Sequence, residues 1–217
     1  ALELARVLTC REGRGEWNCS CASCSQQRQL LHPETLMLGS RSFSEEIAAC
    51  AEVLRRHRQP FAQYLFIRSV RKLTRRFDPV LWEGQEAKIK KGFPILESLE
   101  GDLELFSPGR DLPEEKEFLK VLEGIQKKAA DAVSVIGTDT ISVNQVRRVA
   151  YWIHTTGLGS TKVVIMEGAE KMQDSSRNAL LKTLEESPKN NYFILLSSSK
   201  GPITPTILYR VRASYVK

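Results

Sequence analysis

The sequence contains no apolar run that approaches the ~20 residues a membrane-spanning helix needs, and no signal-peptide pattern opens it. We therefore expect a cytoplasmic protein without a membrane segment. The sequence also lacks the phosphate-binding loop G-x-x-x-x-G-K-[ST] of nucleotide hydrolases. The stretch GLGSTK at 157–162 is interpreted as a turn, because it precedes an apolar run and no helix N-terminus would follow it to hold phosphate.

Acidic residues are absent from positions 53–77, which contain eight arginines and lysines. Within this segment the apolar residues recur at helical spacing, which predicts an amphipathic helix over 61–77 with Phe66, Val70, Leu73 and Phe77 inside. Four basic residues fall on its other face: Arg68, Arg71, Lys72 and Arg75. The whole chain has a net charge of +6, and these four residues are candidate contacts to DNA phosphates. A solvated helix face, or pairing with the acidic stretch at 96–106, are the alternatives.

Four of the five cysteines fall within residues 10–24, spaced C-x8-C-x-C-x2-C: Cys10, Cys19, Cys21 and Cys24. Clustered cysteines in a reducing compartment favour metal ligation over disulfides. Four thiolates leave Zn²⁺ no open position for water or substrate, so we predict a structural zinc site. Cys19 and Cys21 are close for neighbouring ligands, which leaves open whether both bind, with His32 as the nearest spare ligand. Cys50 lies apart and is interpreted as a small buried residue.

The last part of the sequence alternates helices with apolar strands. We expect helices over 141–154 and 174–186, the second capped by Asp174, a helical turn near 205–208, and strands over 162–166, 192–196 and 211–216. This order implies crossover connections and a parallel sheet flanked by helices, an α/β fold. Ligands bind such sheets at the carboxyl ends of the strands. Glu167 and the serines 197–199 follow two of them.

Three regions are therefore expected. Residues 1–38 hold an opening helix and the cysteine cluster, residues 39–137 form an inserted helical region, and residues 138–217 form the rest of the α/β core. A helix capped by Ser44 is predicted within the insertion. Because Ala1 stands inside a helical pattern and no ending signal follows Lys217, we interpret the sequence as a fragment.

Several stretches, in this order, resemble the clamp-loader branch of the AAA+ ATPases, as in bacterial delta-prime and gamma/tau subunits. The segment 177–212, RNALLKTLEESPKNNYFILLSSSKGPITPTILYRVR, carries that family's N-A-L-L-K-T-L-E-E helix from Asn178 to Glu186, followed by an apolar strand. LGSTKVVIMEGAEKM resembles the segment with the Walker B strand. ALELARVL and the four cysteines resemble the helix after the phosphate loop and the family's zinc module. The resemblance covers 1–38 and 138–217 and implies an AAA+ fold.

The resemblance also implies roles for single residues. Glu167-Gly168 stands where the family has a magnesium-binding Asp and a catalytic Glu, so hydrolysis at this site is not expected; the alternative is a solvated carboxylate at a strand end. Ser197, Ser198 and Ser199 lie where a polar residue senses the γ-phosphate. Arg210 aligns with the arginine of the family's S-R-C motif, which acts on a neighbouring subunit's ATP, and Arg212 is the alternative.

The function implied is that of a non-catalytic, delta-prime-like subunit of a DNA polymerase III clamp loader. Its partners would be the gamma/tau and delta subunits, the sliding clamp and primed DNA. Structural Zn²⁺ is expected and ATP binding by these residues is not. A gamma/tau-like ATP-binding subunit and a zinc-containing nucleic-acid-binding module remain the alternatives.

Overall fold

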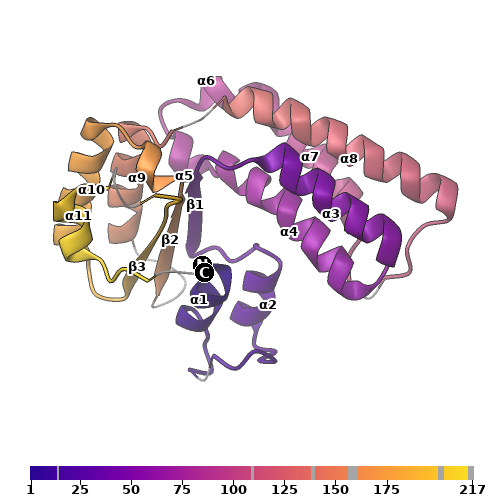
Figure 1. The fold of residues 1–217 in the computed structure, drawn as a ribbon, viewed down its shortest axis with the longest axis horizontal. Coiled ribbons are helices and arrows are strands. Elements are labelled where there is room, and N and C mark those ends of the chain that lie inside the picture. Colours follow the sequence, from indigo (N-terminus) through magenta and orange to yellow (C-terminus); the bar gives the residue numbers. More distant parts are fainter. Residues whose placement is uncertain (14, 109, 138–139, 156–160, 200–202, 215–217) are drawn as a thin grey trace.

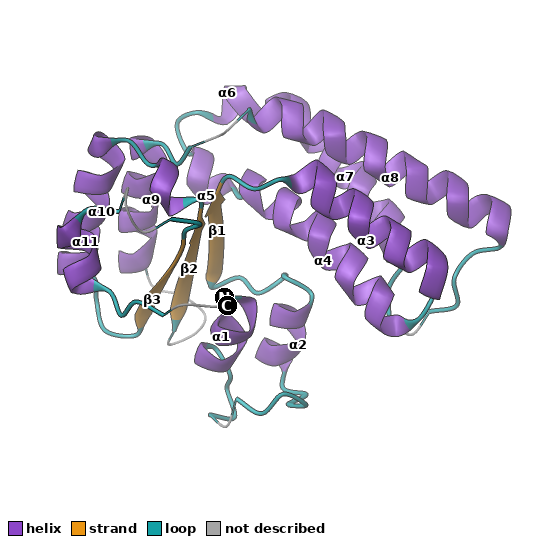
Figure 2. Ribbon diagram, viewed as in Figure 1, coloured by secondary structure: helices purple, strands orange, loops and turns teal. Residues whose placement is uncertain are grey.

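The computed structural model describes residues 1–13, 15–108, 110–137, 140–155, 161–199 and 203–214. They form a parallel sheet with helices on both faces and a long group of helices beside it (Figures 1 and 2). The strands are β1 (Thr35–Gly39), β2 (Lys162–Glu167) and β3 (Asn191–Leu196). The helices are α1 (Leu2–Leu8), α2 (Ala22–Arg28), α3 (Phe43–His57), α4 (Pro60–Thr74), α5 (Pro79–Trp82), α6 (Glu86–Ile89), α7 (Phe93–Glu104), α8 (Glu115–Ile136), α9 (Val143–His154), α10 (Asp174–Glu186) and α11 (Pro205–Arg210). Short 3-10 helices are η1 (Arg75–Phe77), η2 (Lys90–Gly92) and η3 (Ala169–Lys171).

The sheet has the order β1-β2-β3, and both pairs of strands are parallel. Gly39 at the end of β1 lies opposite Glu167 of β2, and Glu167 lies opposite Leu196 of β3. The carboxyl ends of all three strands therefore meet at one edge. The expected α/β fold, its parallel sheet and the strands β2 and β3 are confirmed.

One strand was missed and one strand prediction was wrong. β1 was not predicted, because its five residues give too short a pattern to separate a strand from a loop. A strand was expected over 211–216, but residues 211–214 are not in one, and 215–216 lie outside the described residues, as does most of the GLGSTK stretch. A strand needs a hydrogen-bonded neighbour, and no described strand pairs with this segment.

Strands β1 and β2 are buried on both faces, as continuous apolar runs predict. Strand β3, expected to be buried as well, is only partly buried, because it pairs on one side with β2 and lies at the edge of the described sheet. On one face Leu36, Val164 and Met166 belong to the large core, which continues through α9, α10 and α11 into the helical region. The intervening residues Met37 and Ile165 face a second, smaller cluster that is completed by α1 and by the chain after α2. This alternation follows from the two-residue period of a strand.

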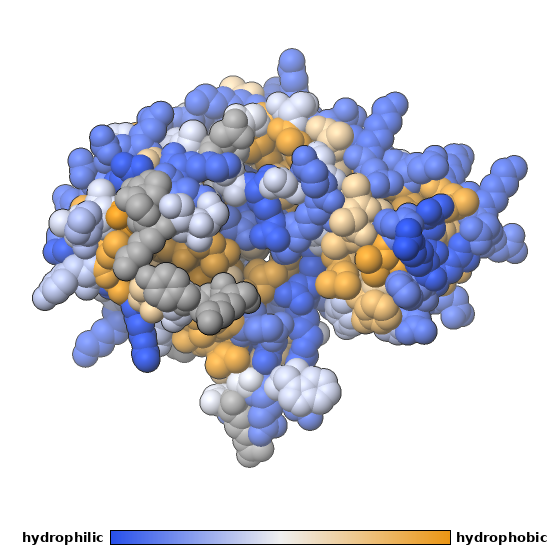
Figure 3. Space-filling view, in the orientation of Figure 1, coloured by the Kyte–Doolittle hydropathy of each residue, from blue (hydrophilic) through white to orange (hydrophobic). Residues whose placement is uncertain are grey.

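Helices α3, α4, α7 and α8, here called the helical module, extend away from the sheet (Figure 1). Their core is centred on Phe66, Phe106 and Phe118, whose rings meet edge to face at centroid distances of 5.7 and 5.6 Å. The predicted amphipathic helix forms as α4 and η1, with its apolar stripe buried. Viewed in space-filling form, the module carries apolar patches among hydrophilic side chains (Figure 3).

Two predicted helix caps are displaced. Helix α3 begins at Phe43 with Ser42 as N-cap, because Phe43 is buried in the core and the helix must include it, so Ser44 is already helical. In α10 the N-cap is Gln173 and Asp174 is the first helical residue, where its carboxylate pairs with Arg177 at 2.9 Å. A negative charge in the first turn still favours the helix through the macrodipole.

Candidate functional site

Glu167 lies at the carboxyl end of β2, where the fold predicts a ligand site, and only 6% of it is exposed. Its Oε1 accepts a hydrogen bond from Arg41 Nη1 at 2.7 Å, and its Oε2 accepts one from Arg76 Nη2. The alternative of a solvated strand-end carboxylate is therefore wrong: the helical region folds over this edge and supplies two guanidinium groups. Glu167, Arg41 and Arg76 are called the strand-end site below.

Arg76 is the most enclosed charge of the strand-end site, at 3% exposed. Its Nε donates to the carbonyl oxygen of Gly39 at 3.0 Å, so one guanidinium joins the ends of β1 and β2. Burial lowers the pKa of Arg76 to about 10, while Glu167 acts in the opposite direction. Arg76 remains protonated at neutral pH. Arg76 was not predicted as a site residue from the sequence. Its one distinguishing feature there is its place near the end of segment 53–77, which contains no acidic residue.

The strand-end site continues into a larger charge network. Arg41 also donates to Glu46 of α3, and Lys72 of α4 pairs with the same carboxylate. The hydrogen bonds from Arg41 and Lys72 lower the pKa of Glu46, although burial opposes them. The network ties the sheet edge to two helices of the helical module. A cation such as Mg²⁺ would have to displace an arginine from Glu167 before binding there.

Gly168 directly follows Glu167 and has a φ of +69°, in the left-handed region that favours glycine. A Cβ at this position would lie 2.8 Å from Ser40 Oγ. A side chain at this position would therefore need the Ser40 side chain to shift and would strain the backbone, so the local geometry disfavours the glutamate that would activate water in a hydrolase of this type.

The three serines after β3 are exposed. Ser198 Oγ donates to Glu170 Oε1 at 2.7 Å, across to the turn after β2, while Ser197 and Ser199 bond to each other. Burial disfavours ionisation of Glu170, but the bonds from Ser198 and Ser197 outweigh it and lower its pKa. The serines stand beside the strand-end edge, and their sensor role stays a prediction.

Arg210 is the last residue of α11 and is exposed. Its guanidinium pairs with Glu185 of α10, the helix that carries the N-A-L-L-K-T-L-E-E motif. Arg212 lies two residues beyond the helix and is also exposed. The structure thus places both candidate arginines at the surface, within the part of the chain that the motif helix supports.

The four basic residues of α4 and η1 proposed to contact DNA have acidic neighbours within the chain. The pairs are Arg68 with Glu3 at 3.9 Å, Arg71 with Glu100 at 3.2 Å, Lys72 with Glu46, and Arg75 with Asp78 at 3.5 Å. Glu100 belongs to the acidic stretch at 96–106, so the pairing considered from the sequence is present for Arg71. These charges join α4 to its surroundings, and a DNA contact by them stays a prediction.

The four clustered cysteines are brought together, with sulfur atoms all within 4.8 Å of one another. Cys10 ends the turn after α1, and Cys21 caps α2, where its Sγ accepts the backbone N–H of Cys24 at 3.4 Å. The sulfurs of Cys19 and Cys21 both belong to the cluster despite their close spacing. His32 does not: its ring nitrogens contact Ser23 Oγ and the Glu34 N–H.

The donor set fits zinc in chemistry and in spacing. Cys10 Sγ and Cys19 Sγ are 3.7 Å apart, close to the roughly 3.8 Å edge of a tetrahedron with Zn–S bonds of ~2.3 Å. Hydrogen bonds from backbone N–H groups lower the pKa of the Cys21 thiol to about 6, whereas burial raises that of Cys24 to about 12. Cys50 lies outside the cluster and is half-buried on α3.

No described helix is both long and apolar enough to cross a membrane.

Comparison with known proteins adds three findings. A family model described as "DNA polymerase III, delta subunit" matches residues 101–217, which excludes the cysteine cluster and includes part of the region expected to be an insertion. No solved structure gives a significant match.

The third finding is a set of curated relatives, each named DNA polymerase III subunit delta-prime. The chain is 40% identical over 80 residues to the protein of Haemophilus influenzae, covering 36% of this chain and 24% of the relative. It is 42% identical over 71 residues to that of Pseudomonas aeruginosa (32% and 22%) and 36% identical over 81 residues to that of Escherichia coli (37% and 24%). The aligned segments thus span about a quarter of these relatives. Because the family model covers more than half of the chain, the protein belongs to the DNA polymerase III delta-subunit family and is delta-prime-like within it.

Proposed function

We propose that this protein is a non-catalytic, delta-prime-like subunit of a DNA polymerase III clamp loader with an AAA+ core. Its partners would be the gamma/tau and delta subunits, the sliding clamp and primed DNA. The family match and the delta-prime relatives support this placement. In such an assembly the subunit positions its neighbours and does not hydrolyse ATP itself.

The strand-end site carries the non-catalytic part of the proposal. A hydrolase of this type needs a free carboxylate to hold Mg²⁺ and an adjacent carboxylate to orient the attacking water. Here Glu167 is held by Arg41 and Arg76, and Gly168 offers no side chain. Two guanidinium groups supply the positive charge that a metal would otherwise bring.

The test is a hydrolysis assay on the full-length subunit with saturating Mg²⁺ and ATP. We expect no release of phosphate above that of a protein-free control. Hydrolysis that is lost on the Glu167→Gln substitution would refute the proposal, because it would show that this carboxylate still serves catalysis.

We further propose that Arg210 acts on the ATP of a neighbouring subunit. A guanidinium placed there stabilises the charge that develops as the γ-phosphoryl group is transferred. Its exposed position at the end of α11 supports this role, since the pair with Glu185 is a surface contact that a phosphate can replace.

The four cysteines are proposed to hold one structural Zn²⁺. When bound, the ion would cross-link the turn after α1 to α2, a segment with few apolar residues of its own. Native mass spectrometry of the reduced protein tests this: one zinc per chain is expected, and substoichiometric metal below half an equivalent would contradict it.

A further inference from the structure

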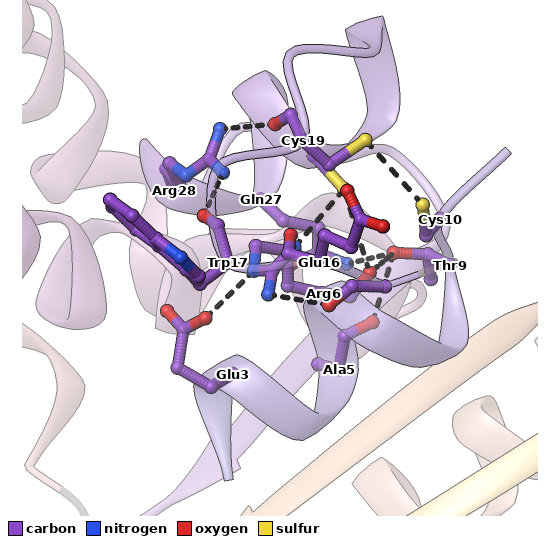
Figure 4. Close-up of polar contacts among 12 residues, drawn as sticks. Glu3, Ala5, Arg6, Thr9, Cys10, Glu16, Trp17, Cys19, Gln27 and Arg28 are labelled. Carbon is purple, nitrogen blue, oxygen red and sulfur yellow. Dashed lines mark hydrogen bonds and ion pairs between the residues drawn. The ribbon is translucent and has the colours of Figure 1, made fainter. Parts of the chain in front are cut away.

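Arg6 of α1 lies against the cysteine cluster, and only 3% of it is exposed. Its Nη1 donates to Cys24 Sγ at 3.4 Å and to the Glu16 carbonyl oxygen at 2.8 Å, and its Nη2 donates to the Gly15 carbonyl oxygen at 3.1 Å. Its Nε donates to Glu3 at 2.7 Å. Figure 4 shows the guanidinium between the carboxylate of Glu3 and the loop that carries Glu16.

A positive charge at Arg6 would compensate the negative charge of a four-thiolate zinc site. Zn²⁺ with four thiolates carries a net charge of −2, and burying net charge is costly unless an opposite charge lies nearby. Cys24 is the fully buried member of the cluster and receives no help from solvent. Arg6 brings a permanent positive charge and an N–H donor to that sulfur.

A second arginine contacts the same loop in a different way. Arg28 of α2 donates to the carbonyl oxygens of Trp17 and Cys19 (Figure 4). These hydrogen bonds of Arg28 end on carbonyl oxygens, whereas Arg6 contacts both carbonyl oxygens and a sulfur. Substituting Arg28 therefore removes contacts to the loop alone, whereas substituting Arg6 removes contacts to the loop and to a sulfur.

We propose that Arg6 is a positioning residue for the metal centre: it holds the Cys24 thiolate and the loop before Cys19, and it offsets the negative charge of the occupied site. Glu3 orients the guanidinium from its far side. This inference rests on the proposed binding of zinc by Cys10, Cys19, Cys21 and Cys24. Outer-shell groups of this kind typically change metal affinity by about 10–100-fold when removed.

The experiment compares the wild-type protein with Arg6→Met, Arg6→Lys and Arg28→Met. Zinc affinity is measured by competition with a chromophoric chelator, and Co²⁺ substitution reports the thiolate-to-metal charge-transfer band. We expect Arg6→Met to weaken zinc binding by about 10–100-fold and to shift the Co²⁺ band. Arg6→Lys should restore part of the affinity because it keeps the charge, and Arg28→Met should weaken binding less than Arg6→Met.

Circular dichroism of each variant separates loss of fold from loss of metal, and Arg6→Lys keeps the test valid if Arg6→Met does not fold. If wild type binds one zinc and both Arg6 variants match it within about twofold, the role of Arg6 is overturned while the zinc site stands. An Arg28→Met loss equal to that of Arg6→Met would also overturn it, because holding the loop would then suffice. If wild type binds no zinc, the metal site and this inference both fail.

Discussion

Replacing Arg76 with methionine tests whether the strand-end site holds the helical region onto the sheet. The substitution keeps much of the side-chain volume but leaves Glu167 buried with Arg41 as its remaining partner, and it frees the carbonyl oxygen of Gly39. Breaking a buried ion pair from one side typically costs about 3–5 kcal/mol when it leaves an uncompensated buried charge, and this range is the upper bound here because Arg41 still compensates part of the charge. At a urea slope of about 1–3 kcal/mol/M, such a loss lowers the unfolding midpoint by roughly 1–5 M.

The assay is urea unfolding of wild type and variant, followed by circular dichroism and by tryptophan fluorescence. Trp82 is a suitable reporter, because its Nε1 donates to the Arg76 carbonyl oxygen at 2.7 Å. The control is Arg55→Met: Arg55 pairs with Glu52 at the surface, where solvent screens the interaction. The double variant Arg76→Met/Glu167→Met should recover part of the loss, since an apolar pair leaves no buried charge. A loss for Arg76→Met no larger than that of the control would refute the reasoning.

Three further predictions follow. Arg210→Ala in a reconstituted clamp loader should lower DNA-stimulated ATP hydrolysis by orders of magnitude, about 10³-fold for a trans-acting arginine, and unchanged turnover would exclude the role. Gly168→Ala should destabilise the protein by about 1 kcal/mol or more, measured by thermal unfolding, because its φ of +69° is unfavourable for alanine and Ser40 is in the way; Gly101→Ala, in open space on α7, is the control. Burial lowers the pKa of His32, so the folded state binds fewer protons than the unfolded one. The free energy of unfolding should therefore be highest above about pH 6.5 and should fall as the pH drops from there toward the lowered pKa of His32 in the folded state. A His32→Gln variant should lose that part of the pH dependence, and identical pH profiles would contradict it.

Local patterns were sufficient for several regular elements of the α/β core. The apolar runs of β2 and β3, and the apolar stripe of α9, are readable without tertiary information. The amphipathic pattern of α4 was equally clear, because its buried stripe is repeated over several turns. The short strand β1 was missed for the opposite reason: five residues do not establish a period.

For the candidate site, too, the sequence predicted the features that depend on neighbouring residues and missed those that depend on distant ones. The cysteine spacing alone predicted the cluster, since all four thiols fall within one short segment that can fold back on itself. Glu167 could be located at a strand end, but its environment could not be predicted. Its partners Arg41 and Arg76 are 126 and 91 positions away in the sequence.

The sequence by itself thus determined the longer helices, the strands β2 and β3 and the place where the thiols gather, because these depend on residues a few positions apart. Only the tertiary structure decided how the charges are used. It placed two arginines on Glu167, gave the basic residues of α4 acidic neighbours, and set Arg6 against Cys24. Ion pairs depend on which surfaces come into contact when the helical module and α1 pack against the sheet. The periodic pattern of a single helix or strand does not show which distant surface it will contact.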